Sequence, residues 1–166
     1  MKKTILALLF LSVAFSLNAQ DKETAPAIKN WVSGELTVPV RYIGIGIGAQ
    51  YERMFSPKIS IGANAAFLFF SGFNELSIDA FFRFYPGGKT FYMGIGLGFD
   101  FIDLKESTFY YFTAGLSPEI GWKIDAGKPG GFFLQPGIKM PDIIHISGGI
   151  DFKINPSLYL GMGYAF

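Results

Sequence analysis

Apolar and polar residues alternate with a period of two along most of this chain, which is the pattern of β-strands with two unlike faces. The clearest stretch is the last one, Leu158 to Phe166, in which every second residue is apolar or aromatic. Clusters rich in Gly, Pro, Asn and Ser separate the alternating stretches and indicate turns. The pattern predicts eight strands, over residues 43–52, 59–69, 76–85, 91–101, 112–124, 132–140, 145–154 and 158–166.

The two faces of these predicted strands differ in charge. One face, with residues such as Ile45, Phe67 and Leu97, contains no charged residue. The inward side chains of an eight-stranded barrel just fill its interior, so such a barrel cannot enclose every apolar residue of this face. We therefore predict that the apolar face points outward into lipid. The predicted fold class is all-β, a closed antiparallel eight-stranded up-and-down transmembrane β-barrel.

The other face would line the lumen and carries all the charged residues of the predicted strands. Because carboxylates and cations nearly balance there, we predict a network of paired charges across a filled lumen, with a narrow channel as an alternative. Aromatic side chains, Phe81, Tyr85, Tyr92, Phe133 and Tyr159, would wall this network. The predicted network consists of Glu52, Asp79, Arg83, Asp100, Glu119, Lys123, Lys139, Asp151 and Lys153.

The chain begins with a targeting segment. Lys2 and Lys3 precede a short apolar run and a small residue, Ala19, which predicts a cleaved signal peptide over residues 1–19. Residues 20–40 are a periplasmic lead-in or the start of the first strand, and residues 41–166 form the barrel. Pro39 interrupts the alternation, so residues 31–40 could extend the first strand with a bulge or lie at the membrane surface.

Composition narrows the possible chemistry. The formal net charge is +1, so no global field attracts nucleic acid, and the absence of Cys excludes disulfides and thiolate metal sites. Two glycine-rich stretches, Gly44–Gly48 and Gly94–Gly98, lie within predicted strands and match no phosphate-binding loop. We expect no cofactor and no bound metal, lipid as the surrounding partner, no nucleic-acid partner, and a monomer.

The signal peptide, the alternating strands and the aromatic C-terminus together resemble the small eight-stranded outer-membrane β-barrel superfamily. The hairpin over residues 81–98 is similar to hairpins of that superfamily. The resemblance implies the outer membrane of a Gram-negative-type bacterium and recognition of Tyr164 and Phe166 by the barrel-assembly machinery. It implies architecture more than role, because the superfamily includes adhesins, anchors and enzymes. The sequence favours a non-enzymatic structural or envelope-integrity role.

One short motif suggests an enzyme. His145 and Ser147 are two residues apart, so both side chains of a strand would lie on one face. This motif resembles the His-x-Ser element of lipid A 3-O-deacylase barrels, in which Asn follows the Ser and an acidic residue further on orients the His. Here Gly148 follows, and Asp151 is the candidate acid. The resemblance implies an alternative function as an outer-membrane esterase.

The predicted strand count also assigns the connections. With both termini in the periplasm, residues 55–58, 86–89, 125–131 and 155–157 would face outside. These connections are mostly short, although outer-membrane barrels usually place their long loops on that side.

Overall fold

The computed structural model describes residues 30–87, 90–105, 110–126, 131–140, 145–146, 150–151 and 156–166. The predicted signal peptide and the first part of the lead-in lie outside these residues. In the part of the chain that the structure describes, no helix is long and apolar enough to cross a membrane.

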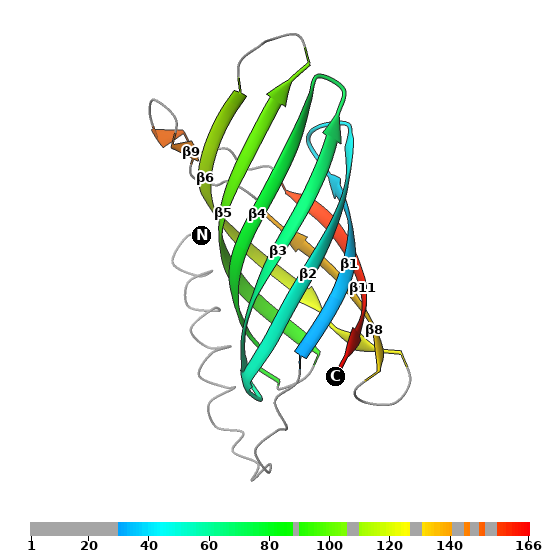
Figure 1. Cartoon of the computed structure of the whole chain (residues 1–166). Coiled ribbons are helices and arrows are strands. Elements are labelled where there is room, and N and C mark those ends of the chain that lie inside the picture. Colours follow the sequence, from blue (N-terminus) through cyan, green and yellow to red (C-terminus); the bar gives the residue numbers. More distant parts are fainter. Residues whose placement is uncertain are drawn as a thin grey trace, which may run out of the picture.

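Eight antiparallel strands form a closed barrel, as predicted (Figure 1). Strands adjacent in sequence pair with each other, and β11 pairs with both β8 and β1, which closes the sheet. A short strand, β7 (Ile124–Asp125), continues β6 past Lys123 in the same register against β8. The eight wall strands are β1 (Asn30–Pro39), β2 (Gly44–Ser56), β3 (Ile59–Phe70), β4 (Phe73–Phe84), β5 (Phe91–Leu104), β6 (Tyr110–Trp122), β8 (Phe132–Lys139) and β11 (Ser157–Ala165).

The orientation of the two strand faces agrees with the sequence pattern. Apolar side chains of every wall strand point outward, and Leu97 on β5 is 52% exposed while Leu160 on β11 is 47% exposed. Polar and charged side chains alternate with them and are buried in the lumen, as at Glu52 and Arg83. A soluble protein would bury these apolar side chains, so the exposed apolar wall requires an apolar solvent.

Residues 30–39 form a complete barrel strand of their own, which differs from both alternatives drawn from the sequence. β1 pairs along its length with β2 on one side and with β11 on the other. The interruption near Pro39 and Arg41 is the turn between β1 and β2, where a residue without a backbone N–H is tolerated at the strand end. The barrel therefore begins at Asn30.

The prediction of a barrel strand over residues 145–154 is wrong. Its described residues belong to two short strands, β9 (His145–Ile146) and β10 (Ile150–Asp151), which pair only with each other, while β8 pairs directly with β11. Both ladders keep one register, because Lys139 pairs with Ser157 and Ile146 pairs with Ile150. β9 and β10 therefore form a separate two-stranded sheet within the chain segment that connects β8 to β11. The Gly-Gly sequence between them is a turn signal.

Because residues 30–39 form the first barrel strand, each later connection up to residues 125–131 lies at the end of the barrel opposite to the one expected from the sequence. Backbone hydrogen bonds join Asn30 to Phe166, and Ala165 to Gly131, so the start of β1, the end of β11 and the start of β8 lie at one end of the barrel. By the antiparallel pairing, β2 and β4 end and β3 and β5 start at this same end. The expectation that residues 55–58, 86–89 and 125–131 face outside is therefore wrong for termini in the periplasm. The long β8–β11 connection lies at the opposite end, with β9 near β6 (Figure 1).

Candidate functional site in the barrel lumen

Glycines on the inward face make room for large lumen side chains. Gly137 on β8 lies under Tyr159, and a Cβ at Gly137 would meet the Tyr159 hydroxyl at 2.5 Å. Gly121 on β6 lies under the ring of Tyr92 in the same way. The Tyr92 and Tyr159 hydroxyls are hydrogen-bonded to each other across the lumen. Each ring can therefore lie over the neighbouring strand and reach into the lumen, because its ladder partner there is a glycine without a side chain.

Arg83 on β4 is the centre of the lumen network and is 1% exposed. Its Nη1 donates to Glu52 at 2.6 Å, its Nε donates to Glu119 at 2.6 Å, and its Nη2 donates to Glu119 at 2.8 Å. Nη2 also donates to Gln50 at 3.0 Å, and Gln135, with its amide oxygen turned toward Arg83, accepts from Nη1 at 3.0 Å. The two bonds to Glu119 have the bidentate geometry that makes guanidinium–carboxylate pairs strong.

Glu52 on β2 joins the Arg83 pair to a second cation. Besides Arg83, it accepts hydrogen bonds from Lys123 at 2.7 Å, from Tyr85 at 2.5 Å and from Ser60 at 2.6 Å. These donors come from the β6–β7 junction, the end of β4 and β3, so one carboxylate ties several parts of the wall together. The low local dielectric strengthens such fully satisfied networks.

Aromatic rings surround both cations. The Nζ of Lys123 lies 3.3 Å from the ring centroid of Trp31, and the guanidinium carbon of Arg83 lies 4.1 Å from that of Phe81 and 4.4 Å from that of Tyr92. Cation–π contacts of this kind gain strength when the cation is desolvated. The aromatic side chains therefore fill the lumen and stabilise its charges.

A second ion pair lies beside the first network. Lys139 on β8 is 3.1 Å from Glu35 on β1, and Glu35 also accepts hydrogen bonds from Thr37 at 2.7 Å and from Asn64 at 3.0 Å. Glu35 was absent from the predicted network because β1 was not recognised as a strand. The alternation of Ser33, Glu35 and Thr37 with apolar residues was the signal that could have identified it.

Two other predicted network residues are buried without an ion pair. Asp79 on β4 is 8% exposed, and its one hydrogen bond is from Ser77 at 3.4 Å. Asp100 on β5 is 1% exposed and accepts from Thr113 at 3.1 Å. Neither pairs with a cation among the described residues. No cluster of three or more His, Asp or Glu that could hold a metal occurs in this part of the chain.

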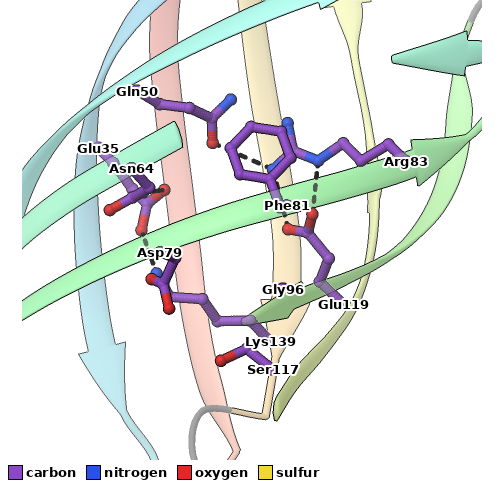
Figure 2. Close-up of a pocket in the computed structure, with 10 residues that line it drawn as sticks. All are labelled: Glu35, Gln50, Asn64, Asp79, Phe81, Arg83, Gly96, Ser117, Glu119 and Lys139. Atoms are coloured by element: carbon purple, nitrogen blue, oxygen red, sulfur yellow. Dashed lines mark hydrogen bonds and ion pairs between the residues drawn. The ribbon is translucent and has the colours of Figure 1, made fainter. Parts of the chain in front are cut away.

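A small cavity lies between the two ion-pair groups and has a volume of about 20 Å³. A cavity of that size has room for roughly one water molecule. Figure 2 shows the residues that line it, most of which carry polar or charged side chains, with Phe81 and Gly96 as the exceptions. The lining residues are Glu35, Gln50, Asn64, Asp79, Phe81, Arg83, Gly96, Ser117, Glu119 and Lys139.

The remaining predicted site residues lie away from this group. Asp151 is on β10 and His145 is on β9, where they are direct partners in the ladder. Ser147 and Lys153 lie outside the described residues. Tyr164 is 48% exposed on the outer wall, and Phe166 exchanges backbone hydrogen bonds with Asn30.

Comparison with known proteins identifies the fold. No protein-family model matches the chain, and no curated protein matches it significantly. The chain is similar to the N-terminal β-barrel domain of Pseudomonas aeruginosa OprF, with 16% identity, a TM-score of 0.58, and coverage of 86% of this chain and 100% of that one. It is also similar to the outer membrane protein OprG of the same organism, with 15% identity, a TM-score of 0.60, and coverage of 84% and 96%. Ail of Yersinia pestis has 14% identity and a TM-score of 0.54 over 84% and 100%. The chain thus has the fold of small outer-membrane barrels.

Proposed function

We propose that this protein is an integral outer-membrane barrel with a closed lumen, which serves a structural or envelope-integrity role and is not an open pore. The observation that carries the proposal is the Arg83 network, which spans the lumen from Glu52 on β2 to Glu119 on β6. The fold and the exposed apolar wall support the location in the outer membrane.

The energetics of the outer wall favour lipid. A Lys or Arg on the lipid face near the bilayer centre costs about 2–4 kcal/mol, and the exposed charges Arg53 on β2 and Asp103 on β5 lie near the ends of their strands, away from that centre. Closure of the sheet is equally necessary, because an open edge would leave backbone groups unpaired in hydrocarbon. The ladder from β11 to β1 meets that requirement.

The lumen supports closure to solutes for two reasons. Its ion pairs are almost fully buried, and their donors and acceptors satisfy one another. Leaving either partner of such a pair uncompensated costs about 3–5 kcal/mol, so thermal motion opens the network rarely. The cavity of about 20 Å³ beside it has room for roughly one water molecule.

The test combines gel mobility with conductance in planar bilayers. Folded protein extracted in detergent is expected to migrate differently before and after heating, and it is expected to give no stepwise conductance after insertion. A double variant, Arg83→Ser with Glu119→Ser, removes the centre of the network and is the positive control for insertion, because it is expected to conduct. Stepwise conductance from the unaltered protein would refute closure and favour the narrow channel.

An esterase is the second candidate, and one observation favours it. His145 and Asp151 are direct partners across the β9–β10 ladder, so the two candidate members of a catalytic set occupy neighbouring positions. The class of substrate would be an acyl ester of lipid A, by resemblance to the deacylase barrels. Expression of the gene would then shorten the acyl pattern of lipid A, and Ser147→Ala and His145→Ala would each abolish that change. Hydrolysis lost in Ser147→Ala would refute the non-enzymatic proposal.

Assembly is proposed to depend on the C-terminal strand. Tyr164 on β11 and Phe166, which directly follows β11, are both exposed, so an assembly partner can contact them before the strand pairs with β1. The barrel-assembly machinery is the proposed partner during biogenesis, and the mature barrel is proposed to be a monomer in lipid.

A further inference from the structure

An amide oxygen that accepts no hydrogen bond and a carboxylate that has no ion pair line the lumen cavity, among the residues that the structure describes. Asn64 and Asp79 are direct partners across the β3–β4 ladder, and both line the cavity (Figure 2). Asn64 is 5% exposed, and its Nδ2 donates to Glu35. Its Oδ1 is buried and accepts no hydrogen bond in the described structure. Leaving such an acceptor without a hydrogen bond destabilises the folded state.

The charges around the cavity do not balance. Glu35 is paired with Lys139, and Glu119 is paired with Arg83, but Asp79 has no ion-pair partner among the described residues. Asp79 therefore leaves a net negative charge in a buried space. A buried carboxylate needs a compensating charge, because its desolvation is far too costly to leave uncompensated.

We propose that this cavity is a binding site for one small monovalent inorganic cation, Na⁺ or K⁺, held by the Asp79 carboxylate and the Asn64 amide oxygen. Oxygen donors are the ligands that hard cations prefer, and the volume of about 20 Å³ accepts one particle of that size. The cation would satisfy the Asn64 acceptor and neutralise Asp79 at the same time.

The donor set argues against a divalent ion. Ca²⁺ takes about six to eight oxygen ligands, and Mg²⁺ keeps several of its waters in an octahedron, for which this cavity has no room. The lining carries one negative charge in excess, because Glu35 and Glu119 are matched by Lys139 and Arg83, so a single positive charge balances it and a divalent ion would not. One carboxylate and one neutral amide oxygen together carry a single negative charge, which matches a monovalent cation. The site goes beyond the proposed function, since a barrel closed by the Arg83 network could exist without it.

The experiment measures thermal stability against cation concentration. The full chain is refolded in detergent micelles with choline chloride as the only salt, and Na⁺ or K⁺ replaces choline at constant ionic strength. The midpoint of the heat-induced change in gel mobility is expected to rise and then saturate, because a ligand that binds only the folded state stabilises it. Broadening of the sodium NMR signal by the folded protein gives a second, direct measurement of binding.

The variants locate the site. Asp79→Asn is expected to abolish both the rise in midpoint and the sodium broadening. Asn64→Ala keeps the carboxylate and is expected to shift the response to a several-fold higher cation concentration. Asp103→Asn is the matched control, because Asp103 is an exposed aspartate on β5 and its loss is expected to leave the response unchanged.

The outcomes separate this proposal from that of a closed barrel. Two results would overturn the cation site. The midpoint of the heat-induced mobility change could be the same in choline and in Na⁺, or Na⁺ could raise it in Asp79→Asn as much as in the unaltered protein. A protein stabilised by acid but indifferent to both cations would also overturn it and would assign the missing charge to a proton on Asp79. If Asp79→Asn does not fold, Asn64→Ala together with the sodium signal still decides the question. None of these results alters the conductance test.

Discussion

Replacing Arg83 with Met is the sharpest perturbation of the lumen network. The Met side chain is similar in length and apolar, so it removes the charge and the hydrogen bonds with limited change in volume. Glu52 would keep its hydrogen bonds from Lys123, Tyr85 and Ser60. Among the described residues, Glu119 would keep only the hydrogen bond from Tyr159 at 3.1 Å. The loss therefore falls mainly on Glu119.

The expected loss of stability depends on Glu119, which loses most of its hydrogen bonds, whereas Glu52 keeps most of its own. Breaking a buried pair by removing one partner destabilises by about 3–5 kcal/mol, and we expect Arg83→Met to lose stability in this range. Adding Glu119→Gln removes the uncompensated charge and is expected to recover about 2 kcal/mol, a coupling typical of contacting residues. Arg53→Met is the control, because Arg53 is exposed on the outer side of β2 and lies outside the lumen network. It should change stability by no more than about 0.5 kcal/mol.

The assay is urea unfolding of the full chain in lipid vesicles, with folded and unfolded fractions separated by their gel mobility. The free energies of the two single variants and of the double variant form a double-mutant cycle. Two results would refute the reasoning. Arg83→Met could lie within about 1 kcal/mol of the unaltered protein, or the double variant could be no more stable than Arg83→Met. Either would mean that Arg83 is not the centre of lumen stability.

Three further predictions concern the wall and the chain end. Leu97→Arg places a charge on the lipid face and should destabilise the vesicle-bound barrel by about 2–4 kcal/mol in the same urea assay. Gly137→Ala should cost about 1–3 kcal/mol, because its Cβ would collide with the Tyr159 ring, whereas Gly72→Ala has open space around it and should be neutral in heat-modifiability. Deletion of Phe166 should reduce the amount of barrel assembled in cells but leave refolding into detergent unchanged; equal assembly would contradict a role in recognition.

The fold was predictable because lipid acts on every wall strand in the same way. The phase of alternation was right at Ile45, Leu97 and Leu160, all of which are exposed on the outer wall. The strand count was also right, but it combined two errors. Residues 30–39 were omitted, and residues 145–154 were included. Alternation indicates that a strand has two unlike faces. Whether the strand belongs to the barrel depends on which neighbouring strands it pairs with, and the sequence pattern of a single strand does not specify its partners.

The sequence predicted which charged residues face the lumen for most of the network, but it did not predict which carboxylate pairs with which cation. Glu52, Arg83, Glu119 and Lys123 were placed on the inward face by their positions, and the structure brings these four together. Which carboxylate meets which cation depends on the stagger of the strands around the barrel, and Arg83 and Glu119 are 36 residues apart. Glu35 was missed together with its strand. Asp151 was expected in the lumen and instead belongs to the β9–β10 extension.

The separation of the lumen into a neutral and an acidic part links the two proposals. Near the chain ends, Arg83 and Lys123 neutralise Glu52 and Glu119 inside an aromatic wall, and that part needs no further partner. The described strands also supply Asp79 and Asp100 to the lumen, and neither has an ion-pair partner among the described residues. Apolar side chains would fill the barrel at a lower desolvation cost than these charged residues. Buried ion pairs are often no more stabilising than packed hydrophobic residues, so filling alone does not explain the charges. The neutral part is therefore best explained as a specific closure of the lumen, and the acidic part as a place where a charge from solution completes the structure.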